Sequence, residues 1–324
     1  MRKFMKATAR FIAVTSLLLA NQAFAENVDN ILVLMPDSSG AKSALVGLQE
    51  EVGEDLNLIT QYVDSSTSIE DLGNFFKSSS PKAVVLMNNP TVNLYKKYQA
   101  SLDPATKHPP ALMMMASFLR QTSSGVQNGT GINYEIAAIT CFVGLRNILD
   151  QPIRRVGVIY RDVFDDFINE QKAMAAQEKI EIVAKRLNTK NVKTSLKKTI
   201  KSLTKSDEVD AIWILNDNVL LNKNLLIKSW LPALKRNEKP VLVNVQSLVS
   251  SKFRFGSFAV LPDHTALGVQ AANLLFDLQE NDWQVGDKEL EEPVAIEKVL
   301  LVPFAKKYLK LKENALDQID VQVD

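Results

Sequence analysis

The sequence predicts an α/β protein made of two doubly wound parallel-sheet lobes joined by a hinge of several segments. Two observations carry this prediction. Short apolar strands alternate with amphipathic helices along most of the chain, an order typical of parallel sheets with right-handed crossovers. The alternation pauses after a predicted helix at 134–149 and starts again at residue 155. Two sets of strand and helix units fit two lobes better than one very wide sheet.

The first half of the chain supplies the elements of the first lobe. Each predicted strand is a short run of apolar or β-branched residues that ends at polar, proline or glycine residues. These strands are 31–35, 58–63, 83–87 and 111–115. Apolar residues three and four apart, such as Leu72, Phe75 and Phe76, predict helices that cover the sheet. These helices are 41–51, 68–76 and 91–100. Ser68, with Asp71 three residues on, predicts a capped helix start.

The second half repeats the pattern after a break at residues 150–152. The predicted strands are 155–160, 181–187, 211–215 and 241–245. The predicted helices are 164–177, 192–203 and 222–236. A later strand at 255–261, a helix at 263–279 and a strand at 296–302 are interpreted as return crossings between the lobes. The predicted first lobe therefore comprises 26–150 and about 262–290, and the second comprises 151–261 and about 291–324.

The N-terminus has the parts of a secretory signal peptide. Basic residues come first, at Arg2, Lys3, Lys6 and Arg10. An apolar run at 11–20 follows, and then the small-x-small sequence Ala23-Phe24-Ala25, after which the mature chain starts at Glu26. The run is shorter than the about 20 residues that span a bilayer, so a cleaved peptide at 1–25 is favoured over an uncleaved anchor. We therefore expect export, most simply to a bacterial periplasm, with no membrane-embedded segment after cleavage.

Composition and motifs argue against several classes of function. A formal net charge of +1 provides no electrostatic footprint for nucleic acid. The single cysteine, Cys141, excludes an intramolecular disulfide. The sequence has no His/Cys metal spacing, no glycine-rich phosphate motif and no recognisable nucleophile setting around its two histidines, His108 and His264. We therefore expect no metal, no cofactor and no enzymatic activity.

Candidate ligand contacts of the first lobe follow its strands, because ligands of open α/β sheets bind at the carboxyl ends of the strands. They are Ser38, Ser39, Asn88, Asn89, Ser117 and Phe118. The two serines precede a helix, so they are candidates either for an anion contact or for helix capping alone. Phe118 is a candidate either for stacking on a planar ligand or for the core.

The second lobe offers a matching set after its first, third and fourth strands. Its members are Tyr160, Arg161, Asp162, Asn216, Asp217, Gln246 and Ser247. The planar guanidinium of Arg161 suits a carboxylate, and Asp217 suits a ligand ammonium. The alternative for both is a solvated ion pair at the rim. Gln246 and Ser247 either donate to a ligand hydroxyl or are ordinary loop residues.

Several segments carry a family resemblance in a consistent order. They are Asn128-Gly129-Thr130-Gly131, the segment Arg154-Arg155-Val156-Gly157-Val158-Ile159-Tyr160, the strand Asp210-Ala211-Ile212-Trp213 with its loop Asn216-Asp217-Asn218, and the segments Pro240-Val241-Leu242-Val243 and Gly268-Val269-Gln270-Ala271-Ala272. The chain resembles the periplasmic substrate-binding proteins of ABC importers with the type I fold, and most closely the tryptophan/tyrosine-binding-protein-like family. It departs from that family after the fourth strand, where Ser117-Phe118 stands in place of a common Asp-Pro.

The resemblance implies a two-lobed protein that closes on a small molecule and presents its closed form to an ABC permease. It also implies an aromatic amino acid or similar zwitterion as ligand, with Arg161, Asp217 and Phe118 holding the carboxylate, the ammonium and the ring. The alternative is a ligand-sensing or ligand-free signalling protein that docks on a membrane sensor protein. An exported α/β enzyme is disfavoured because catalytic residues are missing.

Overall fold

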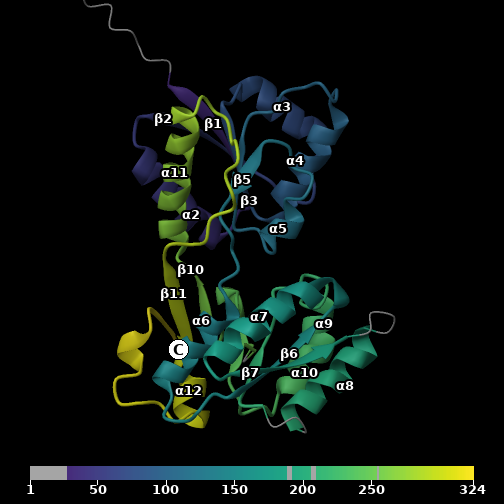
Figure 1. Cartoon of the computed structure of the whole chain (residues 1–324), viewed down its shortest axis with the longest axis vertical. Coiled ribbons are helices and arrows are strands. Elements are labelled where there is room, and N and C mark those ends of the chain that lie inside the picture. Colours follow the sequence, from purple (N-terminus) through teal and green to yellow (C-terminus); the bar gives the residue numbers. More distant parts are fainter. Residues whose placement is uncertain (1–27, 188–191, 206–208, 254) are drawn as a thin grey trace, which may run out of the picture.

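The structure is a computed structural model that describes residues 28–187, 192–205, 209–253 and 255–324. The predicted signal peptide at 1–25 lies outside these residues. The described chain forms two lobes, one above the other in Figure 1, each built around a sheet with helices on both faces. None of the helices in the described ranges combines the length and apolar character needed to cross a bilayer.

The sheet of the first lobe has the strand order β2-β1-β3-β4-β5 among the described residues, and all neighbouring strands are parallel. The strands are β1 (Asp29–Met35), β2 (Leu56–Tyr62), β3 (Ala83–Met87), β4 (Ala111–Met114) and β5 (Gly129–Gly131). The four predicted strands are confirmed. The Gly-Thr-Gly strand β5 was not predicted, because three residues carry too little pattern. A Cβ on Gly131 would lie 2.1 Å from the carbonyl oxygen of Met113, so the close pairing of β5 with β4 requires glycine there.

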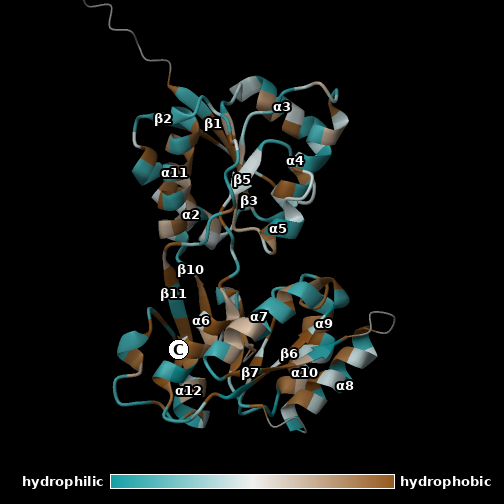
Figure 2. Ribbon diagram, in the orientation of Figure 1, coloured by the Kyte–Doolittle hydropathy of each residue, from teal (hydrophilic) through white to brown (hydrophobic). Residues whose placement is uncertain are grey.

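Helices cover both faces of the first sheet because successive strand residues point to opposite sides. Helices α2 (Ser39–Val52) and α11 (His264–Glu280) pack with Ile31 and Val33. Helices α3 (Ile69–Ser79) and α4 (Asn89–Ser101) pack with Leu32 and Leu34 on the other side. Apolar strands therefore lie inside and polar helix faces outside (Figure 2). The predicted capping box of Ser68 and Asp71 is present at the start of α3.

The sheet of the second lobe has the order β12-β11-β10-β9-β8-β6-β7 in the part of the chain that the structure describes. The strands are β6 (Arg155–Tyr160), β7 (Glu181–Arg186), β8 (Ala211–Trp213), β9 (Val241–Val243), β10 (Phe258–Pro262), β11 (Ile296–Leu301) and β12 (Val321–Val323). Among the described strands of this sheet, β10 and β11 alone pair antiparallel. The reason is topological: β10 leads the chain up to the first lobe, and β11 brings it back.

The helices of the second lobe also lie on both faces of its sheet. Helices α6 (Ala138–Ile148), α7 (Asp165–Gln177) and α12 (Val302–Tyr308) contribute to one core, and α8 (Val192–Lys205) to the other. The predicted helix 222–236 is divided into α9 (Lys223–Leu225), a π-helical segment η3 (Leu226–Trp230) and α10 (Leu231–Leu234). Pro232 explains the division, because proline has no N–H to donate and its ring clashes with the carbonyl four residues before it.

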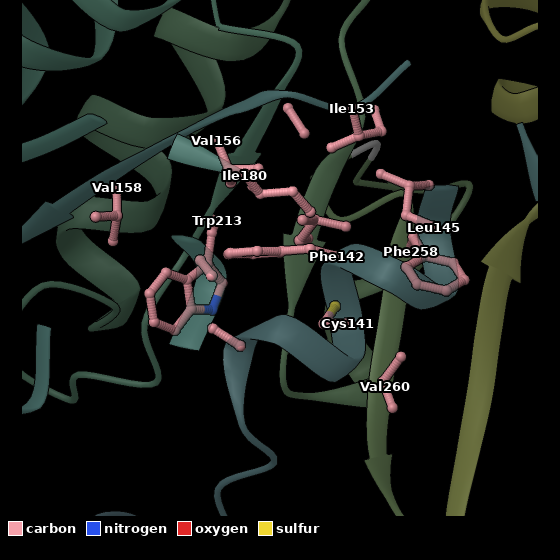
Figure 3. Close-up of a cluster of buried hydrophobic side chains, with 14 of the residues drawn as sticks. Cys141, Phe142, Leu145, Ile153, Val156, Val158, Ile180, Trp213, Phe258 and Val260 are labelled. Carbon is pink, nitrogen blue, oxygen red and sulfur yellow. The ribbon is translucent and has the colours of Figure 1, made fainter. Parts of the chain in front are cut away.

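Helix α6 belongs to the second lobe, although it precedes the break at 150–152. Phe142 and Leu145 pack with Val156, Trp213 and Phe258 of the second sheet (Figure 3). The first crossing between the lobes therefore lies between β5 and α6, at 132–137. The first-lobe boundary expected at residue 150, at the break 150–152, is therefore corrected, because the apolar face of α6 packs into the second core. The other crossings lie between β10 and α11 and at 291–295.

Candidate functional site

The two lobes meet through side chains that follow their strands. Ser117, after β4 in the first lobe, lies opposite Asn216, after β8 in the second. The Nδ2 group of Asn216 donates a hydrogen bond of 2.5 Å to Oγ of Ser117. Both residues were predicted on the principle that strand ends face the gap between lobes, and this contact brings them together.

A cavity of about 310 Å³ surrounds this contact and is lined by both lobes. Of the predicted residues, it brings together Asn89, Ser117, Phe118, Arg161, Asn216 and Asp217. Further lining residues were not predicted, namely Gln121, Thr122, Val163, Phe164, Asn218 and Val219. They belong to short helical turns and loops after the strands. These residues could have been suspected because they come after strand ends. The sequence does not indicate how far each turn extends into the cavity.

Arg161 and Asp217 form an ion pair in the wall of this cavity. Nε and Nη2 of Arg161 donate to the two carboxylate oxygens of Asp217 at 2.6 and 2.9 Å. The Asp217 side chain is 2% exposed and that of Arg161 is 18% exposed. The backbone N–H of Val219 donates to Oδ1 of Asp217 as well. The hydrogen bond to Asp217 raises the pKa of Arg161, so the guanidinium stays charged. The carboxylate of Asp217 is thus occupied from within the protein, whereas Arg161 keeps N–H donors for another partner.

The side chain of Phe118, which follows a strand of the first lobe, packs against aromatic side chains of the second lobe. Its ring lies 4.3 Å from the ring of Phe164 and 5.4 Å, edge on, from that of Phe167, measured between centroids. Its φ of 51° places it in the left-handed region, where a residue other than glycine is strained. A first-lobe loop therefore holds an aromatic side chain against the second-lobe core in a conformation that its surroundings must enforce.

Asn89 holds the Ser117 loop in place. Its Oδ1 accepts from the backbone N–H of Ser117 at 2.8 Å, and its Nδ2 donates to the Ser117 carbonyl at 2.8 Å and to the Thr122 hydroxyl at 2.9 Å. Both ends of the amide are thus used by the protein. Asn89 is a positioning residue for the loop that carries Ser117 and Phe118.

The other predicted residues lie outside this cavity. Ser38 caps α2 by accepting from the backbone N–H of Ala41, and Asn88 caps α4 by accepting from Thr91. Tyr160 lies in the second-lobe core. The remaining four residues are exposed on the surface, namely Ser39, Asp162, Gln246 and Ser247. In the ranges that the structure describes, no three His, Cys, Asp or Glu side chains are grouped so as to hold a metal ion.

Comparison with solved structures identifies the architecture. A ligand-free, open substrate-binding protein with adhesive properties from Clostridium difficile is similar over 92% of this chain and 99% of its own, with a TM-score of 0.66 and 13% identity. A protein from Streptococcus pneumoniae, described as an ABC domain in complex with L-Trp, matches 91% of this chain and 100% of its own, with a TM-score of 0.60 and 18% identity. The chain has the type I periplasmic-binding-protein fold.

An arabinose-binding protein from Geobacillus stearothermophilus also shares this fold, with a TM-score of 0.55 and 11% identity over 86% of this chain and 99% of its own. No family model matches the chain, and no curated protein matches it in sequence. The predicted fold class, two doubly wound lobes joined by several crossings, is confirmed. At these identities the likeness concerns the fold.

Proposed function

We propose that the chain is an exported solute-binding protein of an ABC importer, which closes its two lobes on a small molecule. The observation that carries the proposal is the 310 Å³ cavity to which both lobes contribute polar side chains, including Ser117, Arg161 and Asn216. A solute that touches both lobes makes its full set of contacts only in the closed arrangement. Such a solute populates that arrangement, which a membrane permease can then recognise.

The cavity favours a solute that bears a carboxylate. Arg161 faces the cavity with donors that Asp217 does not use, and its planar guanidinium suits a carboxylate. Asp217 has its oxygens engaged by Arg161 and Val219, so we assign it the role of orienting Arg161. The expectation that Asp217 holds a ligand ammonium is replaced by this assignment. A small zwitterionic or amide-bearing solute remains the proposed class, and the L-Trp complex of the pneumococcal protein supports it.

Location and partner follow from the same proposal. The predicted signal peptide at 1–25 directs the chain to the periplasm, and an ABC permease is the membrane partner. The fold neighbours from Clostridium difficile and Geobacillus stearothermophilus are described as binding proteins, which supports a binding role rather than catalysis.

A thermal-shift screen of the purified mature chain with amino acids, nucleosides and sugars tests the proposal. A solute present at 100 times its dissociation constant should stabilise the fold by about 2.7 kcal/mol. Calorimetry then measures the affinity of each hit for the unmodified chain and for Arg161→Lys. Because lysine cannot reproduce the planar fork, affinity for a carboxylate solute should fall about ten-fold or more. Tight binding of a neutral sugar, with all amino acids silent, would contradict the proposed solute class.

A second candidate is a signalling protein that docks on a membrane receptor without a solute. The observation that favours it is direct contact between the lobes: Ser117 bonds to Asn216, and Phe118 packs on Phe164 and Phe167. Small-angle scattering separates the candidates. An importer component should become more compact when a solute binds, whereas a solute-free signalling protein should have the compact dimensions throughout.

A further inference from the structure

A second cavity lies next to Phe118. Its volume is about 480 Å³, and Phe118 and Gln121 border both this cavity and the smaller one. Its walls come from the α5 turn (Leu119–Thr122) of the first lobe, from α7 of the second, and from the crossings at 132–137 and 291–295. Helices α5 and α7 face each other across the gap between the lobes in Figure 1. We call this space the hinge cavity.

Charged side chains around the hinge cavity are mostly acidic. Its lining carries one cation, Arg120, and the carboxylates of Glu135, Asp166, Glu170 and Glu292. In the described part of the chain, neither Asp166 nor Glu170 takes part in an ion pair. Glu292 accepts one hydrogen bond, of 2.7 Å, from Nδ2 of Asn133. The carboxylates thus create a negative potential in a partly enclosed space, which favours a cation.

Glu135 is the one member of this group with a buried carboxyl oxygen that lacks a partner in the described part of the chain. This oxygen is Oε1, and the residue lies on the first crossing, between the lobes. The pKa of Glu135 is raised to about 7, mainly by burial and to a smaller extent by the charge on Glu292, while hydrogen bonds to the backbone at Phe118 and Glu135 act in the opposite direction. A buried acceptor without a partner costs about 1–3 kcal/mol. A donor supplied by a ligand would remove that cost.

The uncharged part of the lining is mostly apolar, with the amides of Gln121, Asn133 and Gln171 beside it. Phe118, Phe167, Ile136 and Met174 face the cavity from both lobes and from the hinge. An apolar body can pack on these side chains, and a cation near the rings of Phe118 and Phe167 gains further attraction. A volume of about 480 Å³ falls within the range of small-molecule sites.

From these features we propose that the hinge cavity is a second ligand site, for a small organic ammonium ion with an apolar body, whose N–H groups bond to Glu135. The site goes beyond the solute-binding role proposed above and uses different residues. Because the ligand would touch both lobes and two crossings, it would stabilise this arrangement of the lobes. The carboxylates of Asp166, Glu170 and Glu292, which also line the cavity, would add to the attraction for the ammonium.

Titration calorimetry with 2-phenylethylamine and 3-methylbutylamine tests this proposal. The neutral analogue 2-phenylethanol and the anion 3-phenylpropanoate serve as controls for charge. At least one amine should bind, and 2-phenylethanol should bind about ten-fold more weakly or not at all. Amine affinity should increase between pH 6 and pH 8, because Glu135 must be ionised to accept the ammonium and its pKa is about 7. Failure of both amines to bind would overturn the proposal.

Three variants test whether the amine binds in the hinge cavity. Glu135→Gln should reduce amine affinity about ten-fold or more and abolish its pH dependence. Glu51→Gln, the same change at an exposed position of α2 outside the cavity, should leave affinity unchanged. Asn218→Ala, in the lining of the smaller cavity alone, should also leave it unchanged. Loss of amine binding in Asn218→Ala but not in Glu135→Gln would place the cation elsewhere and overturn the proposal. A melting curve of Glu135→Gln verifies that the variant is folded.

Discussion

Arg161 and Asp217, which follow different strands of the second sheet, are joined by two parallel hydrogen bonds of 2.6 and 2.9 Å. This planar arrangement fixes the orientation of both side chains. Asp217 is almost entirely buried, so its charge depends on Arg161 for compensation. The pair therefore contributes to both the stability of the second lobe and the shape of the cavity.

The first prediction concerns this pair. Asp217→Ala leaves the Arg161 guanidinium partly buried and without its partner, so the free energy of unfolding should fall by about 1–3 kcal/mol. Chemical denaturation of Asp217→Ala, Arg161→Ala and the double variant gives the coupling energy. Asp162→Ala is the control, because Asp162 is exposed and lies 3.9 Å from Arg186, and it should change stability by less than about 0.5 kcal/mol. Equal effects at Asp162 and Asp217 would contradict the role of the pair.

The second prediction concerns the hydrogen bond between the lobes. Ser117→Ala removes the acceptor of Asn216, so the closed arrangement should lose about 1 kcal/mol relative to an open one. The radius of gyration in small-angle scattering should increase, while the melting of each lobe changes little. Ser101→Ala, an exposed change at the end of α4, should leave the radius unaltered. Identical scattering from all three proteins would show that this contact does not hold the lobes together.

The third prediction follows from the buried carboxyl of Glu135, whose pKa rises from 4.5 to about 7 in the folded chain. Below pH 4.5 the carboxyl is protonated in both the folded and the unfolded chain, so it does not make stability depend on pH. Between pH 4.5 and 7 the unfolded chain releases the proton first, so this group lowers stability as pH rises, and the full loss is present above pH 7. One pKa unit corresponds to about 1.4 kcal/mol.

Glu135→Gln should therefore be more stable than the unmodified chain at pH 8, by about 1–3 kcal/mol, and the two should be similar near pH 4. Denaturant unfolding of both proteins at several pH values measures the difference. A difference that does not vary with pH would contradict the assignment to Glu135.

The fourth prediction concerns the contact between α2 and α11. A Cβ on Gly268 would lie 2.0 Å from the carbonyl oxygen of Ala44, and a Cβ on Gly47 would lie 2.0 Å from that of Thr265. Gly268→Ala should destabilise the first lobe by about 1–3 kcal/mol, because backbone atoms must move apart. Gly73→Ala in α3 is the matched control, since its Cβ would meet only Tyr98 at 3.6 Å. That change should be neutral or stabilising by up to about 1 kcal/mol, as measured by thermal melting.

Local pattern was sufficient for most elements of this fold. The runs at 31–35, 83–87 and 155–160 are apolar enough to be strands buried on both faces, and they are strands. The strands that were not predicted, β5 and β12, each have three residues, and their pairing depends on a neighbouring strand. The division of the helix at 222–236 was not predicted either, although Pro232 marks its position.

The candidate site was predictable only in outline. The rule that ligands lie at strand ends led to Ser117, Arg161 and Asn216, because a strand end can be recognised in the sequence. Whether two such ends meet depends on strand order and on how the lobes face each other. Ser38 and Gln246 also follow strands, but they lie outside the cavity that holds the other residues.

The sequence by itself determined the α/β class, the two sets of strands and helices, and the positions of the polar residues after the strands. These features depend on the spacing of apolar residues along the chain, which is local. Only the tertiary structure decided that α6 packs on the second sheet, that the carboxylate of Asp217 pairs with Arg161, and that Oε1 of Glu135 is buried. Each of these depends on contacts between residues far apart in the chain, and a carboxylate acquires its partner or its burial only when those contacts form.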